Sequence, residues 1–174
     1  PDYAVTGVQT CALPILPLVQ RQLIEADQSY RQGIAMIDQD IRAAGNLLLE
    51  ARGLLAEIPA ATSAPDVESD AGQLSQLVEN AISRIARNAA EANRRLGMEL
   101  VNQADYEKAL AYFLTAFALH PRAYGGGVAY YCGLCHQMLG QYEAARPYYE
   151  FVILEFPDRD IAGYARNRLR QMGN

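Results

Sequence analysis

The 174-residue chain contains no tryptophan, a single lysine and no apolar run of 18 residues. The missing apolar run predicts that no helix of the given sequence crosses a membrane. Proteins that bind nucleic acid usually carry a stripe of lysine and arginine, whereas this chain has a formal net charge of −5 and shows no basic cluster along its sequence. These absences argue against binding of DNA or RNA.

Sequence motifs of common catalytic sites are also missing. The chain has no G-x-S-x-G, no P-loop and no H-E-x-x-H, the patterns that place a serine nucleophile, a phosphate-binding loop or a zinc-binding helix. We therefore expect no enzymatic activity and no cofactor.

The residues that are abundant favour helices. Alanine, leucine, glutamine and arginine dominate, and runs of β-branched residues are short. Since the abundant residues have high helix propensity, the sequence predicts an all-α protein.

A repeat of 36 residues occupies the C-terminal half. The residues of the first copy that recur are Gly97, Tyr106, Ala109, Phe113 and Pro121, matched by Gly133, Tyr142, Ala145, Tyr149 and Pro157. Two copies at one period are typical of a helical repeat array. We expect each unit to be a pair of helices, in which the glycine lets the second helix approach closely and the proline follows the end of that second helix.

The spacing resembles that of the tetratricopeptide repeat (TPR) family, whose usual period is 34 residues. The resemblance implies that residues 73–174 form a short superhelix, with units at about 90–121 and 126–157 and a capping helix at 160–172. It also implies a scaffold or adaptor that binds a peptide or helix on the concave face of the first helices of its units. The implied groove residues are Glu91, Arg94, Met98, Val101, Asn102, Tyr130, Leu134, Gln137, Met138, Tyr164 and Arg168.

Residues 16–58 are predicted to form a helical arm. From Ile34 to Ile58 apolar residues recur at alternating steps of three and four, a spacing typical of coiled coils, so we expect one long helix over Leu18–Ile58. Residues 59–72 combine proline, serine and aspartate and predict a linker, followed by a second long helix from about Gln73. Two arrangements stay open: the arm folds back as a helical hairpin, or it projects and forms a homo-oligomer with a second chain.

The segment Val5–Ile15 resembles the translation of a sequencing adapter, so we expect residues 1–15 to be an artefact that contributes nothing to the fold. A signal or membrane anchor is then expected only in a missing N-terminus. The order of arm and repeats is similar to that of bacterial envelope TPR proteins. The location stays open between the bacterial cell envelope and the cytoplasm.

The string Cys132-Gly133-Leu134-Cys135-His136 has the C-x-x-C-H pattern of covalent c-type haem attachment. The alternatives are a metal site using Cys132, Cys135 and His136, and simple packing of small apolar thiols in the core of the repeat. A zinc site needs a fourth ligand, and the only other histidine is His120. Core packing is the favoured interpretation.

Overall fold

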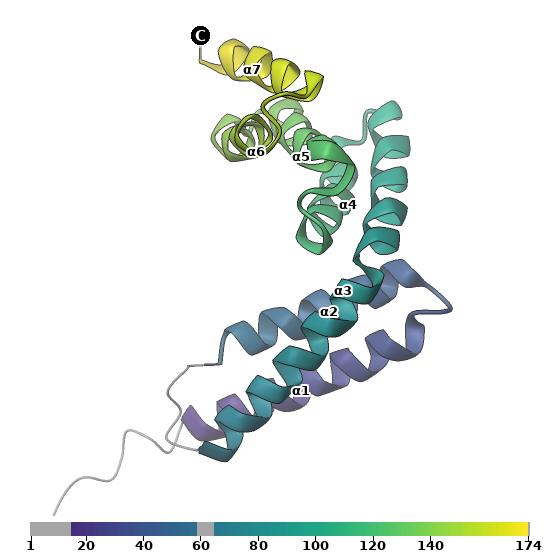
Figure 1. Cartoon of the computed structure of the whole chain (residues 1–174), viewed down its shortest axis with the longest axis vertical. Helices are drawn as coiled ribbons and strands as arrows, with labels where there is room; N and C mark the ends of the chain where they lie inside the picture. Colours follow the sequence, from purple (N-terminus) through teal and green to yellow (C-terminus); the bar gives the residue numbers. More distant parts are fainter. Residues whose placement is uncertain (1–14, 59–64, 174) are drawn as a thin grey trace, which may run out of the picture.

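The computed structural model describes residues 15–58 and 65–173, which form α-helices, one short 3-10 turn and no strand (Figure 1). This confirms the all-α prediction. In chain order the elements are α1 (Ile15–Met36), α2 (Ile41–Ala56), α3 (Pro65–Asn102), α4 (Tyr106–Leu119), η1 (Ala123–Gly126), α5 (Gly127–Met138), α6 (Tyr142–Glu155) and α7 (Asp160–Met172). Within these ranges, no helix combines the length and the hydropathy that crossing a bilayer requires.

The arm is a hairpin of two helices, so the prediction of one long helix over Leu18–Ile58 is wrong. α1 ends at Met36, and Asp40 caps the start of α2 by accepting hydrogen bonds from the backbone N–H groups of Arg42 and Ala43 at 3.0 and 3.1 Å. An aspartate cap of this kind satisfies donors that have no partner inside the helix. The spacing of three and four residues continues through the turn. Ile37 lies before the start of α2 and Ile41 begins it, and both side chains pack against the same core.

The prediction that the linker extends to residue 72 is also wrong. Residues 59–64 lie outside the described part of the chain, and α3 begins at Pro65. Proline suits the first turn of a helix because that position needs no N–H donor. Asp66 and Glu68 place negative charge beside the positive end of the helix dipole, and Val67 and Ala71 are buried. The expected adapter-derived segment lies outside the described residues, apart from Ile15, which begins α1.

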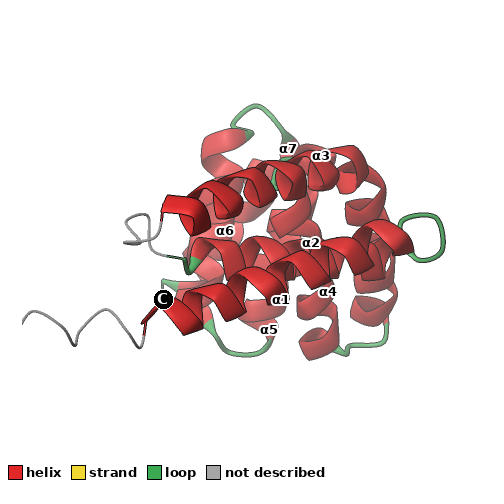
Figure 2. Ribbon diagram, turned by 90° about the horizontal axis from the view of Figure 1, so that it is seen from below, coloured by secondary structure: helices red, strands yellow, loops and turns green. Residues whose placement is uncertain are grey.

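α3 joins the two halves of the molecule. Figures 1 and 2 show its first half beside α1 and α2, forming a three-helix bundle, and its second half beside α4. The core of the bundle is continuous with the start of the repeats, since one buried cluster contains Leu48 of α2, Val78 of α3, Leu119 of α4 and Val128 of α5. The arm therefore packs on the rest of the chain rather than projecting from it.

The two helix pairs α3–α4 and α5–α6 share the same close contact at an interval of 36 residues. A Cβ atom added to Gly97 would lie 2.8 Å from the ring of Phe113, and one added to Gly133 would lie 2.8 Å from the ring of Tyr149. Both rings are fully buried. The predicted approach of the second helix to a glycine of the first is thus confirmed in both units.

The turns inside the two pairs also match. Ala104 and Gly140 both have left-handed backbone conformations, with φ of 59° and 74°. The next residue in each turn donates its N–H to a carbonyl five residues back, Asp105 to Leu100 and Gln141 to His136, both at 2.9 Å. α4 and α6 then end two residues before Pro121 and Pro157, as the sequence predicts. The bounds of α7 equal those expected for the capping helix.

The turn between the pairs is ordered and closely packed. Ala123 and Gly126 of η1 are buried, and Gly126 has a φ of 90°. A Cβ atom at Gly126 would lie 2.7 Å from the ring of Phe156, so only glycine fits both the backbone and the space. This turn connects the end of the first pair to α5 and packs against Phe156 at the end of α6.

Candidate functional site

The predicted groove residues come from three helices that the fold places in succession. Glu91, Arg94, Met98, Val101 and Asn102 lie on the second half of α3, Tyr130, Leu134, Gln137 and Met138 lie on α5, and Tyr164 and Arg168 lie on α7. The phenol oxygen of Tyr130 accepts a hydrogen bond from Arg168 Nε at 3.4 Å, which links α5 to α7. This bond also raises the pKa of the Arg168 guanidinium, since Tyr130 favours its charged form.

Some of these side chains are half-buried and contact the core as well as the surface. Met98 and Val101 pack against the cluster that contains Phe113, whose ring stacks on that of Tyr131 at a centroid distance of 5.2 Å. Gln137 accepts a hydrogen bond from the buried Tyr149 hydroxyl at 2.8 Å. These half-buried residues therefore support the shape of the face and expose only part of their side chains.

Other predicted groove residues are open to solvent. Met138 is 49% exposed and Tyr164 is 60% exposed, and Asn102 at the end of α3 is exposed as well. Tyr164 lines a hollow at the start of α7, whereas Glu91 lines a separate hollow on α3. The face thus has exposed anchor points at each end, but these two hollows do not merge into one.

Glu91 and Arg94 form an ordered pair at the bundle end of this face. Arg94 Nε and Nη2 donate to the two carboxylate oxygens of Glu91 at 2.8 and 2.9 Å, and its guanidinium lies 4.7 Å from the centre of the Tyr124 ring. Hydrogen bonds from Arg94 and Tyr124 lower the pKa of Glu91, and burial raises the pKa of Tyr124. Tyr124, 47% exposed, was missed because the Ala-Tyr-Gly-Gly-Gly segment resembles a plain linker.

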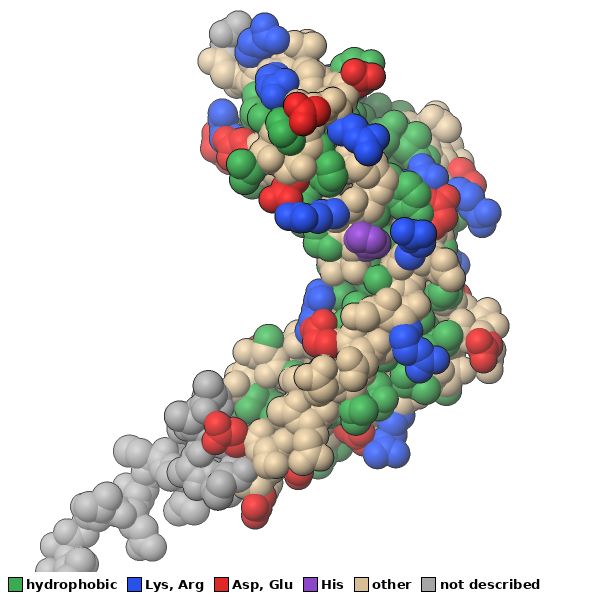
Figure 3. Space-filling model, in the orientation of Figure 1, with side chains coloured by type: hydrophobic (Ala, Val, Ile, Leu, Met, Phe, Trp, Pro, Cys, Tyr) green, Lys and Arg blue, Asp and Glu red, His purple; other side chains and the backbone are tan. Residues whose placement is uncertain are grey.

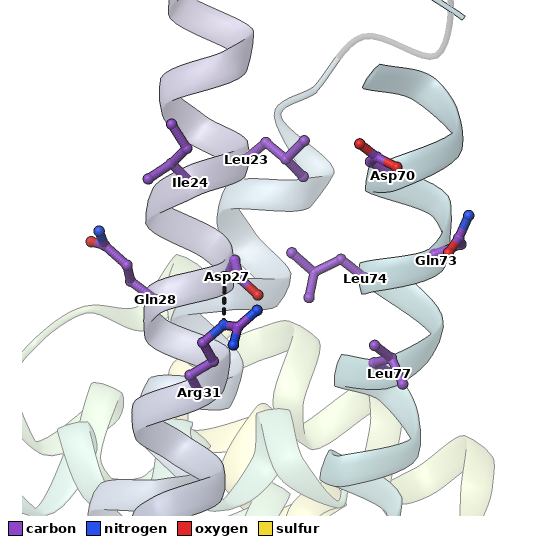
Figure 4. Close-up of a pocket in the computed structure, with 9 residues that line it drawn as sticks. All are labelled: Leu23, Ile24, Asp27, Gln28, Arg31, Asp70, Gln73, Leu74 and Leu77. Atoms are coloured by element: carbon purple, nitrogen blue, oxygen red, sulfur yellow. Dashed lines mark hydrogen bonds and ion pairs between the residues drawn. The ribbon is translucent and has the colours of Figure 1, made fainter. Parts of the chain in front are cut away.

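A second surface, not predicted, is the groove between α1 and α3 in the bundle (Figure 4). Its volume is about 550 Å³, and the side chains of Leu23 and Leu74 point toward each other across it. Asp27 and Arg31 pair on its α1 side at 2.6 Å. Ile24 and Leu77 on its edges are 58% and 48% exposed. This groove leaves apolar surface of the bundle uncovered. Pairing of the arm with a second chain stays a prediction.

The Cys-x-x-Cys-His string lies inside α5, and both of its thiols are in the core. Cys132 and Cys135 have no exposed surface and carry free thiols. Burial raises the pKa of both groups, to about 11 for Cys135. His136 stacks on Tyr148 at a centroid distance of 5.5 Å, and its Nδ1 lies 2.7 Å from Gln141 Oε1. The described residues contain no group of three or more side chains arranged to hold a metal ion.

This geometry favours the packing interpretation of the motif. A thiol reacts or binds metal as the thiolate, and burial at these two positions disfavours that form. Attachment of haem would require both sulfur atoms to be exposed to solvent. The structure instead buries them between α5 and the neighbouring helices.

We expect Cys132 and Cys135 to react with iodoacetamide at pH 8 at least about a hundredfold more slowly in the folded protein than in urea, because reaction requires opening of the core. Mass-spectrometric peptide mapping would follow each cysteine separately, so that labelling of Cys11 does not interfere. Modification of either buried thiol at the unfolded rate would show that α5 does not shield it.

Sequence reasoning also missed a basic pocket. The fold brings Arg87 of α3 next to His120 and Arg122 of the turn after α4, so the prediction that the chain has no basic cluster is wrong at this place. The middle of α3 already carries Arg84, Arg87, Arg94 and Arg95 within twelve residues, which is the signal that could have drawn attention to it.

Comparisons of the chain with protein-family models, with curated proteins and with solved structures found no match.

Proposed function

We propose that this protein is a non-enzymatic scaffold of the TPR type, which binds a peptide or a helix of another protein on the face formed by α3, α5 and α7. The observation that carries the proposal is the repeated packing of Phe113 on Gly97 and of Tyr149 on Gly133. Helix pairs that repeat one contact stack in one direction, and the stack presents an extended surface rather than an enclosed cavity.

The composition of the face supports a protein ligand. Tyrosine and arginine are enriched among the residues that dominate binding energy, and methionine adapts to different partners because its side chain is flexible and polarizable. Met138 and Tyr164 supply exposed apolar area. The hydrogen bond between Arg168 of α7 and Tyr130 of α5 holds two further polar groups in place.

The test starts from peptides selected with the purified protein from a random-peptide display library. We expect the double variant Met138→Ala, Tyr164→Ala to bind a selected peptide at least about tenfold more weakly, since truncating the few anchor residues that dominate an interface costs more than about 1 kcal/mol each. Fluorescence polarisation measures the Kd. The melting temperature is expected to change little, because both side chains are exposed.

The matched control is Tyr142→Ala with Leu154→Ala. These side chains are 51% and 77% exposed, but they belong to α6, which is outside the proposed face. Peptide binding should be unchanged in the control. Equal weakening by both double variants, or none by either, would overturn the assignment of the face. Tyr130→Ala is a poorer choice, because Tyr130 packs in the core cluster around Tyr149.

A further inference from the structure

A basic pocket lies where the second half of α3 meets the turn that follows α4. Its lining residues are Arg87, His120, Arg122, Ala123 and Tyr124, and its volume is about 430 Å³. Figure 3 shows basic side chains, in blue, on both sides of a histidine at the waist between the bundle and the repeats. Two guanidinium groups and one imidazole ring therefore share a hollow, in a chain whose formal net charge is −5.

The charged groups of this pocket are available to a ligand. Arg87 is exposed and forms no ion pair within residues 15–58 and 65–173. Arg122 is paired with Glu155, yet its side chain keeps 69% of its surface exposed. Because a guanidinium has five N–H donors, both arginines can donate to an additional acceptor.

The surroundings of the pocket already bind carboxylates. Glu155 pairs with Arg122, and Glu91 accepts two parallel hydrogen bonds from Arg94. The Arg94 guanidinium lies over the ring of Tyr124, which lines the pocket. Arginine forms such two-bond pairs with carboxylates because the geometries of the two groups match.

The positive charge continues along α3 and favours an extended ligand over a small anion. Between residues 84 and 95 the helix carries four arginines and one glutamate. A neighbouring hollow on the same helix is lined by Asn88, Glu91, Ala92 and Arg95. A nucleic acid needs a long basic track for its evenly spaced phosphates, whereas the arginines of α3 in this patch are confined to residues 84–95. A short acidic peptide needs only this patch.

We propose that the pocket lined by Arg87, His120 and Arg122 binds carboxylate side chains of an acidic peptide segment of the protein partner. This inference rests on the proposed function and adds the charge of the partner to it. The acidic segment enters at the waist of the molecule, and the adjoining part of the partner lies on the face of α3, α5 and α7.

The test uses a fluorescein-labelled hexaglutamate peptide and the full chain at low ionic strength, where exposed charges interact most strongly. Hexaglutamate is expected to bind and hexaglutamine is not. Arg87→Gln and Arg122→Gln should each raise the Kd for hexaglutamate about tenfold, since each removes a charge-assisted hydrogen bond. Arg21→Gln, in the distant part of α1, removes the same charge and should change the Kd less than about twofold. Circular dichroism would confirm that all variants remain folded.

Three results would overturn the inference: equal affinity of Arg87→Gln and Arg21→Gln for hexaglutamate, equal binding of hexaglutamine, or stronger binding of a single-stranded oligonucleotide than of hexaglutamate. Displacement of the peptide by inorganic phosphate at equal concentration would assign the pocket to small anions and would also overturn it. The proposed function is judged separately, because the Met138→Ala, Tyr164→Ala variant reports on the α5–α7 face and keeps the basic pocket intact.

Discussion

Replacing Phe113 by alanine is expected to lower the free energy of unfolding by about 3–5 kcal/mol, the range for deleting a large buried aromatic side chain. Phe113 has no exposed surface and lies between Gly97 of α3 and Tyr131 of α5. Its loss would leave a cavity bordered by two helices whose positions depend on it. Urea denaturation followed by circular dichroism measures the effect.

The control for this prediction is Leu154→Ala, which truncates a side chain that is 77% exposed and should cost less than about 0.5 kcal/mol. A double-mutant cycle tests the contact itself. Gly97→Ala places a methyl group 2.8 Å from the Phe113 ring and should destabilise the protein, whereas in a Phe113→Leu background the smaller side chain should tolerate it. A coupling energy near zero would mean that the two residues do not pack as described.

Replacing Leu48 by alanine is expected to lower the free energy of unfolding by about 3–5 kcal/mol, as for other fully buried leucines. Leu48 has no exposed surface, and its side chain lies 3.0 Å from the position of a Cβ atom on Gly33. We also expect the variant to unfold in a single transition, because the cluster around Leu48 includes Leu119 and Val128 of the repeats. Circular dichroism and tyrosine fluorescence in urea should then give coincident curves.

Leu77→Ala is the matched control, since Leu77 is 48% exposed at the edge of the α1–α3 groove and should cost far less. A Leu48→Ala variant that loses only part of its helix signal at low urea, with the rest melting at the wild-type midpoint, would show that the bundle unfolds by itself. That outcome would contradict the continuous core through α3.

The repeats were predictable from the sequence because the same contact, between a glycine of one helix and an aromatic ring of the next helix, recurs in both units. Gly97 and Gly133 are costly residues in a helix interior, and their recurrence with Phe113 and Tyr149 at a fixed interval has a simple steric explanation. Two of the helix ends also follow local rules, because Asp105 accepts from the Lys108 N–H and Gly140 has the left-handed conformation that glycine adopts readily.

The arm was harder to predict because hydrophobic spacing does not distinguish a continuous helix from two helices whose apolar faces meet in one core. Ile37 and Ile41 keep the expected interval although the chain reverses between them. The polar segment Asp38-Gln39-Asp40 was the available signal, since aspartate is a favoured N-cap. In the same way, the proline, serine and aspartate of residues 59–72 suggested a linker, but Pro65 begins a helix.

For the candidate site, the sequence predicted which helices form the face but not which of their side chains are exposed on it. Met98, Val101 and Gln137 were predicted as groove residues, yet they pack against or hydrogen-bond to the core. The arginines of α3 were visible in the sequence, but the pocket was not, because Arg87 and Arg122 are 35 positions apart and only the path of the chain after α4 brings them together.

The sequence by itself determined that this protein is helical, that its C-terminal half repeats every 36 residues, that α4 and α6 end before Pro121 and Pro157, and where α7 begins and ends. These features are encoded locally, in helix propensities and in small-to-large contacts that recur. The tertiary structure alone decided that the arm folds into a bundle, that one core runs through α3 into the repeats and that arginines distant in sequence share a pocket. The physical reason is that burial and charge clustering depend on which surfaces meet. The identity of an apolar or basic residue does not specify which residue it will contact.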